Sequence, residues 1–207
     1  MAKLLLLDID GTIIDTPHYE AWQWAARRLG MTAPSPREYA ASIAGSPRAI
    51  GAERIVEING GNEPRLTKLL AELKQERLLE LSPDIKFFPD AERLLGRVLG
   101  TSTQVSFYTA SLNAARFLEN AFSQTSFSKF RVDLYIQVST ESRLKLIKRV
   151  SENWLSEHVV LVDGAKHSVE IAADLGMEAY QISREVLKLP GGSETVRVIT
   201  SLDDLKI

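Results

Sequence analysis

The apolar residues of the chain first gather in a short run close to its start. Leu4 to Leu7 are four consecutive leucines, and Asp8 ends the run. A continuous apolar run of this length is typical of a strand that is buried on both faces, as in a parallel sheet. We therefore expect a central β-strand over residues 4–8, with polar residues at its carboxyl end.

Strand and helix patterns alternate through the second half of the chain. The residues Leu144, Ile147 and Val150 recur at helical spacing, and Gly176 follows the periodic segment 169–175 at the position of a helix C-cap. The expected strands are 104–109, 134–138, 159–162, 179–182 and 196–199, and 201–205 is expected to form a short capped helix. This order of elements predicts βαβ units and a parallel sheet.

A helical segment separates the first strand from the rest of the predicted sheet. Apolar residues recur there at helical spacing in two stripes, Ala21, Trp22, Ala25 and Leu29, and Leu66, Leu69, Leu70 and Leu73. The fold class that we expect is α/β, a Rossmann-like core with a parallel sheet and an inserted α-helical subdomain. The core would comprise residues 1–14 and 90–207, and the helical insertion residues 15–89.

The composition narrows the functions that such a protein can perform. The 207 residues include 25 Lys and Arg against 27 Asp and Glu, a net charge of −2 that offers no broad attraction for nucleic acid or an anionic membrane. The absence of cysteine excludes disulfides, thiolate zinc sites and a cysteine nucleophile. The apolar run at 4–7 is too short for a signal peptide, and no run approaches the length of a membrane span. We expect a cytoplasmic protein that binds a small, charged ligand.

Two carboxylates stand at the end of the first strand. Asp8 and Asp10 are two residues apart, so on strand periodicity they point the same way, and Gly11 permits a sharp turn after them. Their like charges repel, a cost that a bound divalent cation reverses. The alternative is that Asp10 and Thr12 only cap the turn that leaves a core strand, because short motifs also occur by chance.

Polar residues also end two later strands. Thr109 follows the predicted strand segment 105–108, and Asp163 follows the apolar run 159–162. Taken singly, Thr109 could cap the following helix and Asp163 could be a turn residue. In open α/β sheets, however, ligands bind at the carboxyl ends of the strands. The recurrence of polar residues at three strand ends therefore favours a functional site.

These motifs together resemble those of the haloacid dehalogenase superfamily, over nearly the whole chain. The residues that carry the resemblance are Leu7 to Ile13 with Asp15, Thr109, Val162-Asp163 and Ile171 to Met177. The resemblance implies that the helical insertion is a cap of the C1 type and that Phe88 to Ala91 mark the return to the core. It implies a Mg²⁺-dependent phosphoryl-transfer enzyme, a phosphatase-like hydrolase acting on a small phosphorylated metabolite.

The resemblance also implies roles for individual residues. Asp8 would attack phosphorus and form an aspartyl-phosphate, and Asp10 would protonate the leaving oxygen and then activate water. Mg²⁺ would be held by Asp8, the backbone carbonyl of Asp10 and Asp163. The phosphoryl oxygens would be held by residues of the turns and loops, namely Gly11, Thr12, Thr109, Ala110 and Ser111.

Two departures from the superfamily pattern concern a second acid and a lysine. Gly164 occupies the position next to the third carboxylate and Ser168 the later acidic position, so we expect weak affinity for magnesium. The usual lysine has no clear counterpart in residues 137–143. Lys145 is the nearest lysine and our candidate catalytic cation. Arg143 could serve instead, and a solvated helix face explains either residue about as well.

In the helical insertion, residues 45–48 are expected to form a loop that faces the site. Arg48 in this loop is a candidate to bind a second anionic group of the substrate, and a surface arginine on a turn is the alternative.

Hydrolysis is preferred over dehalogenation because Asp10 supplies the acid that ester cleavage requires. A phosphomutase of the same superfamily is one alternative. A non-catalytic binding or structural protein is another, favoured by the missing acid at Gly164.

Overall fold

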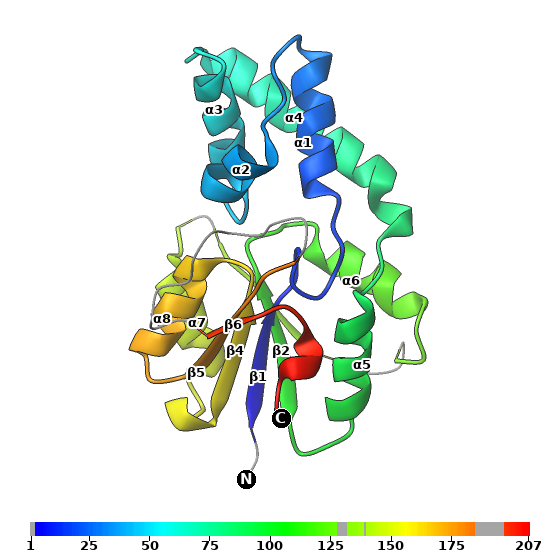
Figure 1. The fold of residues 1–207 in the computed structure, drawn as a ribbon, viewed down its shortest axis with the longest axis vertical. Coiled ribbons are helices and arrows are strands. Elements are labelled where there is room, and N and C mark those ends of the chain that lie inside the picture. The colour runs from blue at the N-terminus through cyan, green and yellow to red at the C-terminus, as the bar shows by residue number, and fades with distance from the viewer. Residues whose placement is uncertain (1–2, 128–131, 139, 185–196) are drawn as a thin grey trace. The chain divides into compact units, whose positions relative to one another are not determined.

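Six parallel strands form one sheet in the computed structural model of the chain (Figure 1). The structure describes residues 3–127, 132–138, 140–184 and 197–207. The strand order is β3-β2-β1-β4-β5-β6. The strands are β1 (Leu4–Asp8), β2 (Gln104–Thr109), β3 (Asp133–Ile136), β4 (Val159–Asp163), β5 (Glu178–Ile182) and β6 (Arg197–Ile199). The predicted parallel sheet is confirmed, although Val196, where the last strand was expected to begin, lies outside the described residues.

Helices cover both faces of this sheet. They are α5 (Pro89–Val98), α6 (Ala114–Ser123), α7 (Arg143–Ser151) and α8 (Lys166–Asp174), with short 3₁₀ turns η3 (Ser156–His158) and η5 (Leu202–Asp204). Figure 1 shows α7 and α8 on one side of the sheet and α5 and α6 on the other. The protein therefore has the α/β, Rossmann-like fold that the sequence predicted. In the part of the chain that the structure describes, no helix is both long and apolar enough to cross a membrane.

Alternation along the strands decides which side chains meet which helices. Leu4 and Leu6 of β1 pack in one cluster with Ile147 of α7. On the other face, the ring of Phe107 in β2 lies 6.2 Å from that of Phe122 in α6. All four leucines of β1 are fully buried, as expected of a strand covered on both faces. Any side chain at the end of β1 on the Leu4 and Leu6 face therefore points towards the side of α7 and α8.

The chain divides into two compact units, residues 1–15 with 86–207, and residues 16–85. The sequence placed these boundaries at 14/15 and 89/90. The later boundary differs because Phe87 forms a bridge with Ile14 and the amide of Phe88 donates to the carbonyl of Ile13, so both residues belong to the sheet-bearing unit. The elements of the second unit are α1 (His18–Arg28), α2 (Pro36–Glu38), a π-helical turn η1 (Tyr39–Ile43), α3 (Arg48–Ile58), α4 (Pro64–Leu81) and the 3₁₀ turn η2 (Ser82–Asp84).

The buried face of α4 differs from the stripe that the sequence predicted. Leu70 is buried as expected, but Leu69 is 43% exposed. The face continues instead through Lys74 and Leu78, which are both buried and follow Leu70 at steps of four residues. The sequence pattern missed this face because a lysine occupies its centre.

Candidate active site

Two aspartates and a tyrosine occupy matching positions at the carboxyl ends of three neighbouring strands. Asp8 of β1 pairs in register with Tyr108 of β2. Leu7 pairs with Val162 of β4, so Asp163 is the next position along and lies beside Asp8. Because β1 lies between β2 and β4, the register alone brings the two carboxylates together at the sheet edge where the sequence predicted a site.

The carboxyl group of Asp8 is nearly enclosed, with 8% of the residue exposed. The Thr12 hydroxyl donates to Asp8 Oδ2 at 3.1 Å and accepts a hydrogen bond from the Gly164 amide, also at 3.1 Å. Burial raises the pKa of Asp8 well above its usual range, the charge of Asp163 raises it further, and the Arg143 guanidinium opposes both effects. The ionised form of Asp8 would therefore be stabilised by positive charge placed next to it.

The turn that follows β1 is fixed by its backbone and by one arginine. Gly11 has a φ of 74°, a left-handed conformation that favours glycine, and its amide donates to the Ile14 carbonyl at 2.9 Å. The Arg184 guanidinium donates to the Thr12 carbonyl and to Asp90 Oδ2, the latter at 2.6 Å. Sequence reasoning missed Arg184 because its partners lie far away in the chain.

Asp10 lies against the end of β2. The Thr109 hydroxyl donates to Asp10 Oδ2 at 3.2 Å and accepts a hydrogen bond from the Ser111 amide at 2.9 Å. Thr109 is 2% exposed, and Ala110 beside it is half-buried. The structure thus brings together Asp10, Thr109 and Ser111, which the sequence selected from segments about 100 residues apart in the chain.

Asp163 is held by hydrogen bonds to both of its oxygens. The Tyr108 hydroxyl donates to Oδ2 at 2.8 Å, and the Ala165 amide donates to Oδ1 at 2.7 Å. Burial and the nearby charge of Asp163 raise the pKa of Tyr108 well above its usual range, so the phenol stays protonated and can donate. The sequence placed Tyr108 in a strand but did not select it as a site residue.

The cation that faces these carboxylates is Arg143, the first residue of α7. Its guanidinium carbon lies 5.6 Å from the centre of the Tyr108 ring, and its charge acts on Asp8. Its Nη1 atom is buried and has no hydrogen-bond partner among the described residues. Lys145, the candidate chosen from the sequence, is exposed on the same helix, and its charge acts on Glu141. Of the two candidates, Arg143 is thus the one that packs on Tyr108 and whose charge acts on Asp8.

The carboxylates also limit which metal could bind here. Within the described ranges, no group of three or more His, Cys, Asp or Glu side chains is arranged to hold a metal ion. Asp8 and Asp163 are two adjacent carboxylates whose mutual repulsion a divalent cation would relieve. Mg²⁺ fits such a sparse set, because it keeps several waters and binds substrate phosphate. Ser168, at the later position where an acid was expected, is buried, and its hydroxyl adds no carboxylate to this set.

In the second unit, Arg48 does not lie within a loop as predicted. It is the first residue of α3, and its guanidinium donates to the Gln75 side chain of α4. The buried Lys74 of α4 has its ammonium 2.7 Å from His18 Nδ1 and 5.3 Å from the centre of the Trp22 ring. Two cationic side chains of this unit are thus held by neighbouring helices.

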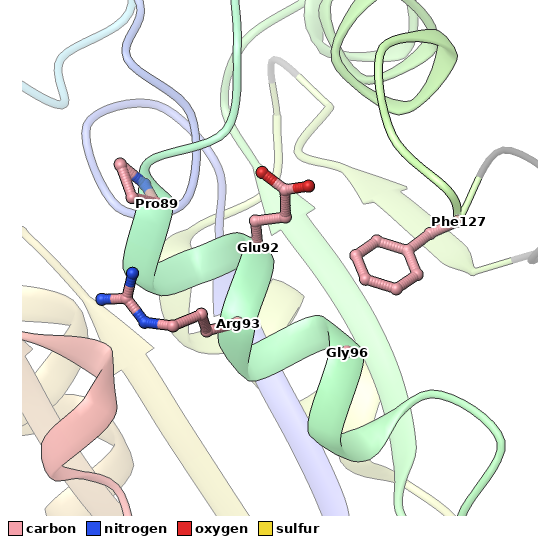
Figure 2. Close-up of a pocket in the computed structure, with 5 residues that line it drawn as sticks. All are labelled: Pro89, Glu92, Arg93, Gly96 and Phe127. Atoms are coloured by element: carbon pink, nitrogen blue, oxygen red, sulfur yellow. The ribbon is translucent and has the colours of Figure 1, made fainter.

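A surface hollow of about 360 Å³ lies on α5, away from the residues described above (Figure 2). It is lined by Pro89, Glu92, Arg93, Gly96 and Phe127. Arg93 points to solvent on this helix and pairs with Asp203 of η5. The hollow contains none of the clustered aspartates, so it is not the candidate active site.

Solved structures with the same fold include phosphoryl-transfer enzymes. No family model matches the sequence, and a search of curated proteins finds no match. The β-phosphoglucomutase from Clostridium difficile is similar over 100% of this chain and 94% of its own, with 20% identity and a TM-score of 0.77. A predicted phosphoglycolate phosphatase from Haemophilus somnus covers 98% and 95%, at 10% identity and a TM-score of 0.76.

A third similar structure holds a sugar bisphosphate. CbbY from Rhodobacter sphaeroides, in complex with xylulose-1,5-bisphosphate, is similar over 99% of this chain and 96% of its own, with 18% identity and a TM-score of 0.74. The chain therefore has the fold of haloacid dehalogenase-like phosphatases and phosphomutases, which is the fold that the sequence motifs predicted.

Proposed function

We propose that this protein is a Mg²⁺-dependent phosphatase of small phosphomonoesters, with Asp8 as its nucleophile. The observation that carries the proposal is the pair of buried, adjacent carboxylates Asp8 and Asp163, which faces a guanidinium with an unpartnered buried nitrogen on Arg143. An enclosed set of anions beside one unpaired donor suits a phosphoryl group and its metal ion. Buried donors usually have a hydrogen-bond partner, so an unpaired guanidinium nitrogen beside two carboxylates is consistent with a site for an anionic ligand.

The nucleophile and the acid are held by separate hydroxyl groups. Thr12 fixes the carboxylate of Asp8, which would attack phosphorus and form an aspartyl-phosphate as the ester oxygen leaves. Thr109 fixes the carboxyl group of Asp10, which in its protonated form would give its proton to that leaving oxygen. Asp10 would then take a proton from water as the water attacks the aspartyl-phosphate. Two positioned carboxylates thus divide the work of attack and proton transfer.

Positive charge would come from the protein and from the metal. Arg143 would donate its free Nη1 hydrogens to a phosphoryl oxygen, since guanidinium groups bind phosphate through directed hydrogen bonds. Asp8, Asp163 and the backbone carbonyl of Asp10 would hold Mg²⁺, which when bound offsets the charge of the phosphoryl group. Arg48 of the second unit stays a prediction from the sequence for a second anionic group of the substrate.

Magnesium titration with a chromogenic aryl phosphate tests the proposal. Phosphate release that depends on Mg²⁺ supports a phosphatase. If instead a sugar phosphate is isomerised with little release of phosphate, the protein is a phosphomutase. Binding of phosphate without turnover of any ester would make it a non-catalytic relative and would end the enzymatic proposal.

The choice between the two candidate cations can be decided by a pair of substitutions. Arg143→Ala should lower kcat/KM by roughly 10²- to 10³-fold, the usual effect of removing one donor that stabilises a transition state. Lys145→Ala should change it by less than about threefold, because an exposed, screened charge contributes little. Steady-state kinetics on both variants with one substrate provides the comparison. An equal loss in both would contradict the assignment to Arg143.

Adding an acid beside Asp163 should tighten magnesium binding. Gly164 does not have a positive φ, and a Cβ atom there would meet Thr12 Oγ1 at 3.7 Å and the Ile182 carbonyl at 3.8 Å, which are ordinary contacts. Gly164→Asp should therefore fold and lower the half-saturating Mg²⁺ concentration by roughly 3- to 10-fold, because it adds an anion near the ion. Gly164→Ala is the matched control, and it should leave this concentration unchanged. Equal curves for both variants would show that position 164 does not face the metal.

A further inference from the structure

The Tyr108 hydroxyl reaches the carboxylate of Asp163 across an intervening strand. Tyr108 is on β2 and Asp163 is on β4, with β1 between them. Neighbouring strands lie about 4.8 Å apart, so the phenol must pass over the end of β1. It nevertheless comes within 2.8 Å of Asp163 Oδ2 and is fully buried. A long side chain with a polar tip is therefore required at this position.

The hydrogen bond from Tyr108 fixes the orientation of the Asp163 carboxylate. The residues on either side of Asp163 in the sequence are not acidic. The Ala165 amide holds Oδ1 of Asp163 at 2.7 Å while Tyr108 holds Oδ2. An ionised carboxylate has about four lone-pair sites, so each oxygen keeps capacity for a metal ion. The residue after Asp163 is Gly164, which offers no second carboxylate to bind the metal ion.

The ring of Tyr108 is itself held in place by its neighbours. The Arg143 guanidinium lies 5.6 Å from the ring centre, a distance at which a cation is attracted to the face of an aromatic ring. The ring also belongs to the buried cluster that includes Leu6 and Leu146. The hydroxyl of Tyr108 thus has little freedom to leave Asp163.

We propose that Tyr108 is a positioning residue of the metal site, and that its hydroxyl holds Asp163 in the orientation that binds Mg²⁺, in place of the acid missing at Gly164. This inference rests on the proposed function, because it takes Asp163 as a metal ligand. The competing explanation is that the contact only stabilises the fold. The two explanations differ in whether loss of the hydroxyl changes magnesium affinity.

Tyr108→Phe tests the inference because it removes the hydroxyl and keeps the ring. The measurement is the Mg²⁺ concentration that gives half of the magnesium-dependent rise in melting temperature, with no substrate present. This concentration should increase by roughly 10- to 100-fold, as for other residues that orient a metal ligand. The matched control is Tyr180→Phe, which removes a hydroxyl bonded to Glu178 Oε1 at 2.6 Å and should change the concentration by less than about twofold.

Each outcome of this experiment has a separate meaning. If Tyr108→Phe melts at a lower temperature but keeps the wild-type half-saturating concentration, the contact is structural and the inference is overturned. If the wild type itself shows neither a magnesium-dependent rise nor phosphatase activity, the proposed function fails and the inference fails with it. Recovery of tight binding in the double variant Tyr108→Phe, Gly164→Asp would support the replacement of an acid by the phenol.

Wild-type protein allows an independent test if Tyr108→Phe does not fold. With tyrosines labelled with ¹³C at the ring carbon that bears the hydroxyl, added Mg²⁺ should shift the signal of Tyr108 and leave that of Tyr180 in place. An unmoved Tyr108 signal at magnesium concentrations that activate the enzyme would overturn the inference.

Discussion

Asp8→Asn is expected to abolish phosphatase activity, leaving no turnover above background with any ester. An amide oxygen is a far weaker nucleophile than a carboxylate, so the aspartyl-phosphate cannot form. The loss should be the same for esters with good and poor leaving groups, because attack on phosphorus is blocked in every case. Stopped assays of phosphate release, run on pure protein, measure the effect. Turnover at the wild-type rate would contradict the assignment of Asp8.

The stability of the same variant provides a second, independent measurement. Burial and the charge of Asp163 raise the pKa of Asp8, so without magnesium the wild type loses folding free energy as the pH rises from the usual aspartate pKa to that raised pKa, and the full cost remains at higher pH. Asp8→Asn removes this cost. In EDTA at neutral pH the variant should therefore melt at the same temperature as the wild type or higher, and its advantage should shrink as the pH falls from the raised pKa to the usual aspartate pKa. A large drop in melting temperature would mean that Asp8 has a structural role.

Asp10→Asn is expected to lower kcat by about two to four orders of magnitude while substrate still binds. The reason is that Asp10 is held by Thr109 beside the nucleophile strand and would supply the proton that the leaving oxygen needs. The loss of kcat/KM, which reports formation of the aspartyl-phosphate, should be largest for alkyl phosphates and smallest for nitrophenyl phosphate, whose leaving group needs little protonation. Comparing the two ester classes in wild type and variant separates this role from that of Asp8.

An unchanged rate with an alkyl phosphate would show that Asp10 only shapes the turn after β1. An equal loss of kcat/KM for both classes of ester would point to a role in phosphoryl binding instead. The variant can also be trapped: with a good leaving group, phosphorylated enzyme should accumulate, because activation of the hydrolytic water also depends on Asp10. Mass spectrometry of quenched protein measures this accumulation.

The sequence predicted the strands that carry the site because their signals are local. A run of four leucines closed by Asp8 can be buried only in the middle of a sheet, and strand ends are marked by Thr109 and Asp163 in the same way. The parallel sheet brings such ends to one edge whatever the details of packing. The roles of Gly11 and Gly176 followed similarly, since both have a positive φ at the turns where glycine was expected.

The cation and the supporting tyrosine could not be chosen in this way. Arg143 and Lys145 both belong to the start of α7, and only the packing of that helix decides that the guanidinium lies against Tyr108 while the ammonium is exposed. Lys74 is a comparable case in the second unit, where a charged residue lies at the centre of a buried helical face. Sequence periodicity identifies the buried face of a helix by its apolar residues, so it does not predict that a charged residue is buried there.

The sequence by itself determined the α/β class, the strand ends and the carboxylates Asp8, Asp10 and Asp163, because each depends on a few adjacent residues. Only the tertiary structure decided the set of contacts at that edge. Strand order and register place β1 between β2 and β4, so Asp8 lies beside Asp163 and the Tyr108 hydroxyl reaches across to it. Register is a property of pairs of strands, here about 100 and 155 residues apart, which no local pattern contains.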